Sequence, residues 1–140
     1  MKKDVLVTVK GTQVNELGEE DTIELITKGN YFFKNESYYI IYNETEISGM
    51  EGTTTSLKAE PRRITLNRMG SAEQKQVFEV NTLNISNCVT PFGTWVMGVI
   101  PSKVEVDLTD MGGSINLEYE LNNGTEKVSD NRLSITVKEV

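Results

Sequence analysis

The chain has 140 residues, with 14 basic and 21 acidic side chains and a net charge of −7. This length suits one domain with a single hydrophobic core, and the acidity disfavours binding to nucleic-acid phosphates or to anionic membranes, which attract basic patches. Histidine is absent, so the usual general base near neutral pH and the commonest zinc ligand are both missing.

The start of the chain alternates apolar and polar residues. In "DVLVTVK", Val5, Val7 and Val9 share one face of a strand. Two lysines are followed by Asp4 instead of the apolar core of a signal peptide, and no stretch reaches the roughly 18 apolar residues of a membrane span. We therefore expect a cytoplasmic protein whose first strand lies near residues 4–11.

The same two-residue alternation continues to the end of the chain, interrupted by turn signals such as "NELGEED", "KNES", "RMGSAE" and "LNNGTEK". Further strands are expected near residues 21–34 with a bend at Gly29, 37–45, 52–59, 62–68, 75–88 with a break, 94–109 with a bend at Pro101, 114–122 and 131–138.

Strands with one apolar face must form a sandwich or a barrel, and short sequential hairpins favour the barrel. The predicted fold is all-β: one domain over residues 1–140, forming a single antiparallel up-and-down β-barrel of eight to ten strands. A barrel with about eight strands has an interior wide enough for side chains or one small ligand.

Two charged residues fall on the apolar faces of predicted strands. Glu44 shares its parity with Tyr42, and Arg68 shares its parity with Leu66. A carboxylate inside a barrel needs a cationic or hydrogen-bonding partner. We predict that Glu44 and Arg68 face each other near one end of the barrel, with Tyr42 and Thr55 completing the hydrogen bonds. Two interpretations remain open: a polar cluster that orients a ligand, or an ion pair that fixes the strand register.

The stretch "TPFGTW" also allows two interpretations. Phe92 and Trp95 belong either to a bulged corner that packs its aromatic rings into the core, or to a loop that contacts a ligand at the mouth of the barrel. The single cysteine, Cys88, has no partner for an intramolecular disulfide and is expected to be a small buried residue. The acidic stretches "GEED" and "DLTDMGGS" lack the spacing of a calcium loop.

An ordered set of residues resembles a known family: Tyr42-x-Glu44, Gly49, Thr53 to Thr55, Lys58, Arg68-x-Gly70, Phe78, Thr90-Pro91-Phe92-Gly93 and Tyr119. Over about residues 20 to 138 the chain resembles the YwiB-like family of small bacterial proteins of unknown function. The resemblance implies a calycin-like, lipocalin-like β-barrel and a bacterial cytosolic setting, and it implies no established activity.

The favoured function is a small-ligand binding module with a cavity in the barrel. The alternative is a protein-interaction or assembly domain whose barrel is filled by its own side chains, and an enzyme is the least favoured class. No catalytic residue, metal or cofactor is predicted, and the sequence indicates no particular oligomeric state. The predicted ligand-binding residues are Tyr42, Glu44, Thr55, Arg68, Phe92 and Trp95.

Overall fold

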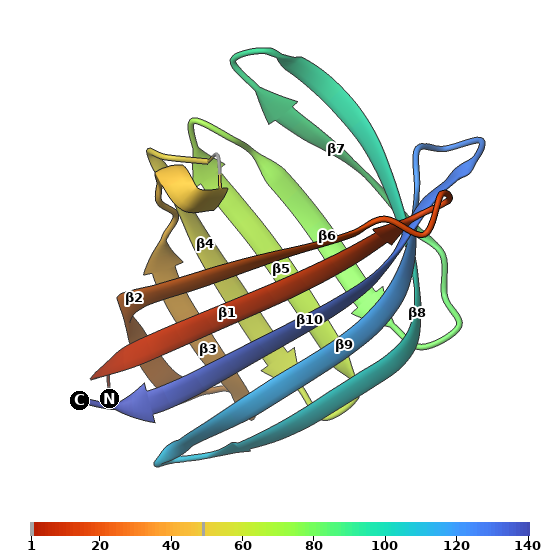
Figure 1. Ribbon diagram of the computed structural model, residues 1–140. Helices are drawn as coiled ribbons and strands as arrows, with labels where there is room; N and C mark the ends of the chain where they lie inside the picture. The colour runs from red at the N-terminus through yellow and green to blue at the C-terminus, as the bar shows by residue number, and fades with distance from the viewer. Residues whose placement is uncertain (1, 49) are drawn as a thin grey trace.

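The computed structural model describes residues 2–48 and 50–140, so Gly49 of the family resemblance lies outside the described residues. Over these ranges, ten antiparallel strands form one sheet that curls into a nearly closed barrel (Figure 1). The strands are β1 Lys3–Asn15, β2 Glu20–Lys34, β3 Ser37–Asn43, β4 Thr53–Glu60, β5 Arg63–Gly70, β6 Gln74–Glu79, β7 Asn84–Thr90, β8 Gly93–Thr109, β9 Gly112–Asn122 and β10 Lys127–Glu139, and a single 3-10 turn, η1, covers Glu46–Ser48.

The strand order confirms the predicted up-and-down barrel. Each strand pairs with its neighbours in the sequence except at β6 and β7, which are the two edges of the sheet, and β1 pairs with β10. The order around the sheet is therefore β6-β5-β4-β3-β2-β1-β10-β9-β8-β7. The predicted bend near Pro101 is a register shift between Pro101 and Lys103 in the pairing of β8 with β9. Within the described ranges, no helix is long and apolar enough to cross a membrane.

The first strand is longer than predicted. β1 continues to Asn15, where it still pairs with Ser129 of β10, while Val14 pairs with Glu20 of β2. The turn that follows is tight because the side-chain oxygen of Asn15 accepts hydrogen bonds from the backbone nitrogens of Leu17 and Glu19, at 3.0 Å each. An Asn side chain can hold such a turn without a long loop.

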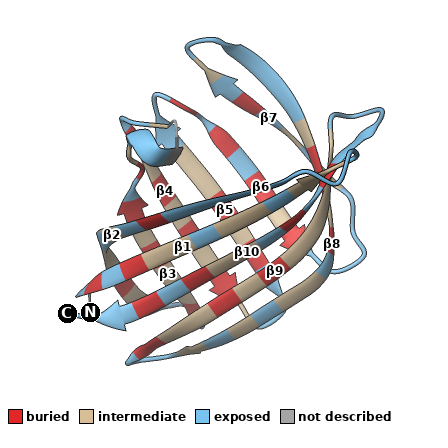
Figure 2. Ribbon diagram, in the orientation of Figure 1, coloured by how far each residue is buried: buried red, intermediate tan, exposed pale blue. Residues whose placement is uncertain are grey.

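Buried and more exposed residues alternate along most strands (Figure 2), and the buried apolar residues of the strands other than β7 form the core. In β4, for example, every second residue from Thr53 to Ala59 is buried. One end of the barrel is closed by the stacked rings of Tyr31 and Tyr38, whose centroids are 5.3 Å apart. The Tyr31 hydroxyl donates to the carbonyl oxygen of Thr109 at 2.6 Å, which ties β2 to the end of β8.

Gly29 allows β2 and β3 to pack closely at the predicted bend. A Cβ atom at this position would lie 2.6 Å from the carbonyl oxygen of Ile41 and 2.9 Å from a methyl group of Val7. Real Cβ atoms do not approach other atoms so closely. A side chain at this position would therefore push β2 away from β3 or displace the core side chain of Val7. A strand glycine at a bend with close backbone approach is the expected solution.

The seam between β6 and β7 is closed mainly by side chains instead of a regular backbone ladder. At one end Glu73 and Val89 form an isolated bridge. At the other, the side-chain oxygen of Asn84 accepts from the backbone nitrogen of Val77 at 2.9 Å and from the Gln76 amide at 2.8 Å. The barrel is therefore nearly closed, and this seam is its interruption.

The hairpin of β7 and β8 extends beyond the end of β9, because the pairing of β8 with β9 starts only at Gly98 (Figure 1). Phe92 at its turn is 91% exposed and Trp95 is 57% exposed. The interpretation that these rings pack into the core is therefore wrong, because both are largely exposed. Cys88, on β7, is buried as predicted.

Candidate functional site

The strand register brings Glu44 and Arg68 together at the open end of the barrel. Arg68 on β5 pairs with Thr55 on β4 and with Gln74 on β6, so its side chain points inward with theirs. Glu44 follows β3 directly, and its backbone nitrogen donates to the carbonyl oxygen of Thr53 at 2.8 Å. This bond keeps Glu44 in line with Tyr42 on the inner face.

The predicted ion pair is confirmed. Nε of Arg68 lies 3.8 Å from Oε2 of Glu44, and the side chains are 19% and 3% exposed respectively. At about this distance, opposite unit charges near a protein surface attract by about 4 kcal/mol, but 3.8 Å is too long for a hydrogen bond. The hydroxyl of Thr55 donates to the same carboxylate oxygen. The two charges therefore neutralise each other without forming a tight bidentate pair.

Tyr42 is the second hydroxyl beside the carboxylate. Burial raises the pKa of Tyr42 well above its usual range, the negative charge of Glu44 raises it further, and the positive charge of Arg68 partly opposes this shift. Tyr42 therefore stays protonated at physiological pH and can donate to Glu44. This agrees with the prediction that Tyr42 and Thr55 complete the hydrogen bonds around the pair.

A buried amide network extends from Arg68 to the β6–β7 seam, and sequence reasoning missed it. Nη1 of Arg68 donates to the side-chain oxygen of Gln74 at 2.8 Å. The Gln74 amide nitrogen then donates to Gln76 at 3.0 Å and to Ser86 at 3.2 Å, and Gln76 continues to Asn84. The alternation in "QKQVFE", which places both glutamines on the inner face with Phe78, could have indicated it.

Two hollows meet at Arg68. The first is an apolar lobe of about 180 Å³ at the open end of the barrel. Apart from Glu44, Arg68 and Tyr42, its walls are apolar side chains and Gly11. They include Leu57 and Ile135 from the core and Ile23 and Leu133 nearer the rim. An apolar hollow with a few convergent polar groups is the usual form of a small-molecule site.

The second hollow, a polar lobe of about 260 Å³, shares Gly11, Ile23, Arg68 and Leu133 with the apolar lobe and also reaches Met97, Tyr119 and Asn131. Polar side chains on this wall are bonded to one another: Gln13 donates to Ser129 at 3.0 Å, and Ser129 donates to Asn131 at 3.0 Å. Burial raises the pKa of Tyr119 above its usual range, opposed by the charge of Arg68 and by a hydrogen bond with Asn131.

The structure brings together four of the six predicted ligand-binding residues: Tyr42, Glu44, Thr55 and Arg68. The other two lie on the β7–β8 hairpin, and among the described residues neither Phe92 nor Trp95 belongs to the lining of the two lobes. Met97 of the same hairpin does line the polar lobe, and the Gln74 amide contacts its sulfur at 3.5 Å. That all six residues contact a ligand stays a prediction.

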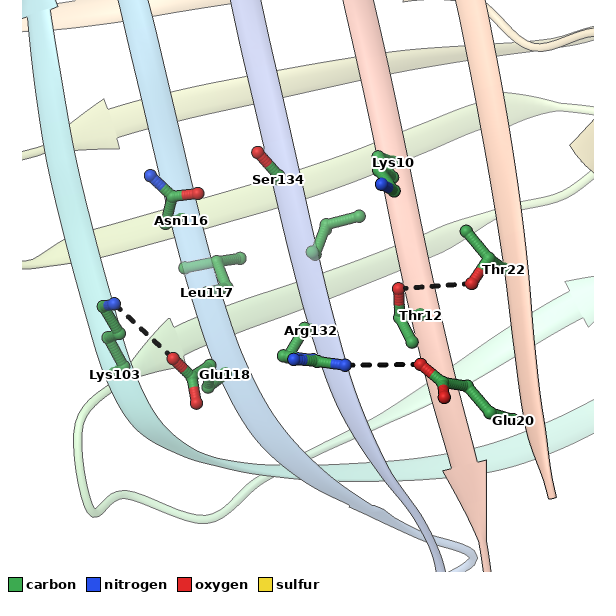
Figure 3. A pocket seen from close by; sticks show the side chains of 11 residues that line it. Lys10, Thr12, Glu20, Thr22, Lys103, Asn116, Leu117, Glu118, Arg132 and Ser134 are labelled. Atoms are coloured by element: carbon green, nitrogen blue, oxygen red, sulfur yellow. Dashed lines mark hydrogen bonds and ion pairs between the residues drawn. The ribbon is translucent and has the colours of Figure 1, made fainter. Parts of the chain in front are cut away.

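A further hollow lies on the outer surface of β1, β9 and β10 (Figure 3). Four of its five charged side chains are paired with one another: Arg132 lies 3.4 Å from Glu20, and Lys103 lies 3.5 Å from Glu118. These pairs are exposed, and exposed ion pairs contribute little to the stability of the fold. This surface therefore resembles an ordinary solvated barrel face more than a binding site.

Comparison with known proteins gives the same fold. The family model that matches residues 7–135 is described as a domain of unknown function, DUF1934. The chain is 25% identical over 137 residues to an uncharacterized beta-barrel protein, YwiB, of Bacillus subtilis strain 168, covering 97% of this chain and 95% of that protein. A crystal structure of the ywiB protein from Bacillus subtilis matches with a TM-score of 0.89 at 21% identity, covering 99% of this chain and 93% of that chain. The chain therefore belongs to the DUF1934 family of domains of unknown function.

Proposed function

We propose that this protein is a small-ligand binding module whose site is the apolar lobe at the open end of the barrel. The observation that carries the proposal is the position of the Glu44–Arg68 pair. It lies at the side of an apolar hollow of about 180 Å³ and not in a filled core. Such a volume has room for about six groups the size of a water molecule or a methylene. The ligand is therefore small and largely apolar.

The structure offers a pair of matched variants that tests this function. Ile23 on β2 lines both lobes and is half exposed at the rim, whereas Ile26 on the same strand is similarly exposed but lines neither lobe. Ile23→Trp should obstruct the mouth without disturbing the core, and Ile26→Trp adds the same ring to the outer surface.

Two measurements follow. Native mass spectrometry of freshly purified protein should detect a bound small molecule in the wild type and in Ile26→Trp, and much less of it in Ile23→Trp. Ligand-observed NMR with 1-hexanol, a probe of suitable size, should give the same order of binding. If the wild type carries no bound molecule and does not bind 1-hexanol, the proposed function is wrong.

As a second function, we propose that the β7–β8 hairpin is a contact surface for a second copy of the chain. No charged residue occurs between Glu79 and Lys103, although 25% of the chain is charged. On the outer face of the hairpin, Ile85, Val89 and Val96 are exposed near one another. Two acidic chains can meet at such a surface without opposing like charges, and exposed apolar patches commonly mark interaction sites.

Sedimentation velocity over a range of protein concentrations tests this second function. The wild type should form a dimer as the concentration rises, and Val96→Lys should weaken it at least tenfold by placing like charges at the contact. Ile26→Lys, on the outer face of β2, is the control and should leave the dimer unchanged. A wild type that stays monomeric at every concentration would exclude this role.

A further inference from the structure

The guanidinium of Arg68 has hydrogen-bond donors that the protein does not use. Nη1 donates to the side-chain oxygen of Gln74 at 2.8 Å, and this is the one hydrogen bond of the guanidinium within the described part of the chain. Among the described residues, the buried Nε has an ion-pair partner in Glu44 but no hydrogen-bond partner. A guanidinium carries five donors in a planar fork, so donor capacity remains. A buried donor without a partner in a native structure calls for a bound water or ligand.

The neighbouring acceptor is held in place and cannot close the gap. The Glu44 carboxylate is fixed by the Thr55 hydroxyl, by the proximity of Tyr42 and by the backbone bond to Thr53. It therefore stays 3.8 Å from Nε of Arg68. A carboxylate has about four acceptor positions, so capacity for a further donor remains. The pair thus leaves donor capacity on the guanidinium, whose side chain is 19% exposed, and acceptor capacity on the carboxylate, and both residues line the apolar lobe.

The charges of the pair decide which ligand head fits. An anion bound at Arg68 would be attracted by the guanidinium and repelled by Glu44 at a comparable distance, so the two Coulomb energies largely cancel. The anion would still lose its hydration in an apolar lobe, and the protein's net charge of −7 would repel it further. A cation meets the converse problem at Arg68. An uncharged polar head avoids both costs and can satisfy both partners.

We propose that the open end of the barrel binds an uncharged small molecule whose polar head carries an acceptor and a donor side by side, as a primary amide does. The acceptor accepts a hydrogen bond from Arg68, the donor donates one to Glu44, and the apolar body lies against Leu57, Leu66 and Ile135. This proposal rests on the proposed function, because it assigns a chemical class to the ligand of the same cavity.

The test uses three probes with the same tail: hexanamide, hexanoate and hexylamine, the last being protonated at neutral pH. Their binding to the wild-type protein is measured by isothermal titration calorimetry at constant ionic strength. Hexanamide should bind at least tenfold more tightly than either charged probe. Because this comparison needs no mutation, it decides the proposal even if every variant fails to fold.

Variants of the pair should change the preference in opposite directions. Glu44→Gln leaves the charge of Arg68 uncompensated, so hexanoate should bind more tightly than hexanamide. Arg68→Met leaves Glu44 uncompensated, so hexylammonium should become the preferred probe. Arg63→Met is the control: Arg63 lies on the same strand in an exposed pair with Glu60, and its loss should keep the order of the wild type.

The outcomes separate this proposal from the proposed function. If the three heads bind equally, the cavity binds apolar molecules and the assignment of the head is wrong. If hexanoate or hexylammonium binds most tightly to the wild type, the assignment is likewise wrong. If neither these probes nor 1-hexanol binds, both the assignment and the proposed function fail.

Discussion

Removing either charge of the Glu44–Arg68 pair should destabilise the barrel, and removing both should restore part of the loss. In Arg68→Met, the Glu44 side chain remains 3% exposed with hydroxyl groups but no cation, so the loss should be about 3–5 kcal/mol. Glu44→Gln should cost less, about 1–3 kcal/mol, because Arg68 is 19% exposed and keeps its bond to Gln74. The coupling energy between the two sites should be about 1–3 kcal/mol.

Urea denaturation followed by circular dichroism measures all four proteins of this double-mutant cycle. The slope of the unfolding free energy against urea should stay constant, since the surface exposed on unfolding is unchanged. Arg63→Met serves again as the control, with no measurable change expected for an exposed pair. Single variants that each cost under about 1 kcal/mol and add without coupling would show that the pair is as weak as a surface ion pair.

Three further predictions follow from the interior. Burial raises the pKa of Tyr42 and Tyr119, so the folded state keeps these hydroxyl protons to a higher pH than the unfolded chain does. The free energy of unfolding should therefore stay constant below the ordinary tyrosine pKa of about 10 and fall as the pH rises above it. Denaturation at a series of pH values should show a smaller fall for Tyr42→Phe than for the wild type. Gly29→Ala should lower the unfolding free energy by about 1–3 kcal/mol because its Cβ overlaps the next strand, and a thermal melt equal to the wild type would contradict this. Asn84→Ala should cost about 1–3 kcal/mol because the backbone nitrogen of Val77 loses its acceptor, although Gln76 keeps its bond to the backbone carbonyl oxygen of residue 84. The variant should speed hydrogen exchange in β6 and β7 but not in β1.

The barrel and the buried pair could be predicted because strand residues alternate between two faces. The parity of Glu44 with Tyr42, and of Arg68 with Leu66, places both charges inside once the faces are known, and a buried charge then requires its partner. The network of Gln74 and Gln76 was not predicted, because a polar residue is ordinarily assigned to the wet face of a strand.

The β7–β8 hairpin shows a different limit of sequence reasoning. Phe92 and Trp95 are large apolar residues of the kind that usually pack in a core, but the length of the neighbouring strand decides whether a core exists beneath them. β9 ends at Asn122, opposite Gly98, so the hairpin beyond that pair has no strand on this side. Alternation along β8 contains no information about where its partner stops, and the exposure of Trp95 follows from that.

The position of the chain ends in the barrel has a consequence for folding kinetics. The start of β1 and the end of β10 lie side by side (Figure 1), and the backbone nitrogen of Val140 donates to the carbonyl oxygen of Asp4 at 3.3 Å. The pairing of β1 with β10 therefore joins the two ends of the chain, whereas the weakly bonded β6–β7 seam falls in its middle. In a circular permutant with the old termini linked and new termini at residues 80–83, every regular strand pairing would join two strands that follow one another in the sequence. Its contact order would fall, and since folding slows as contact order rises, this permutant should fold faster than the natural chain.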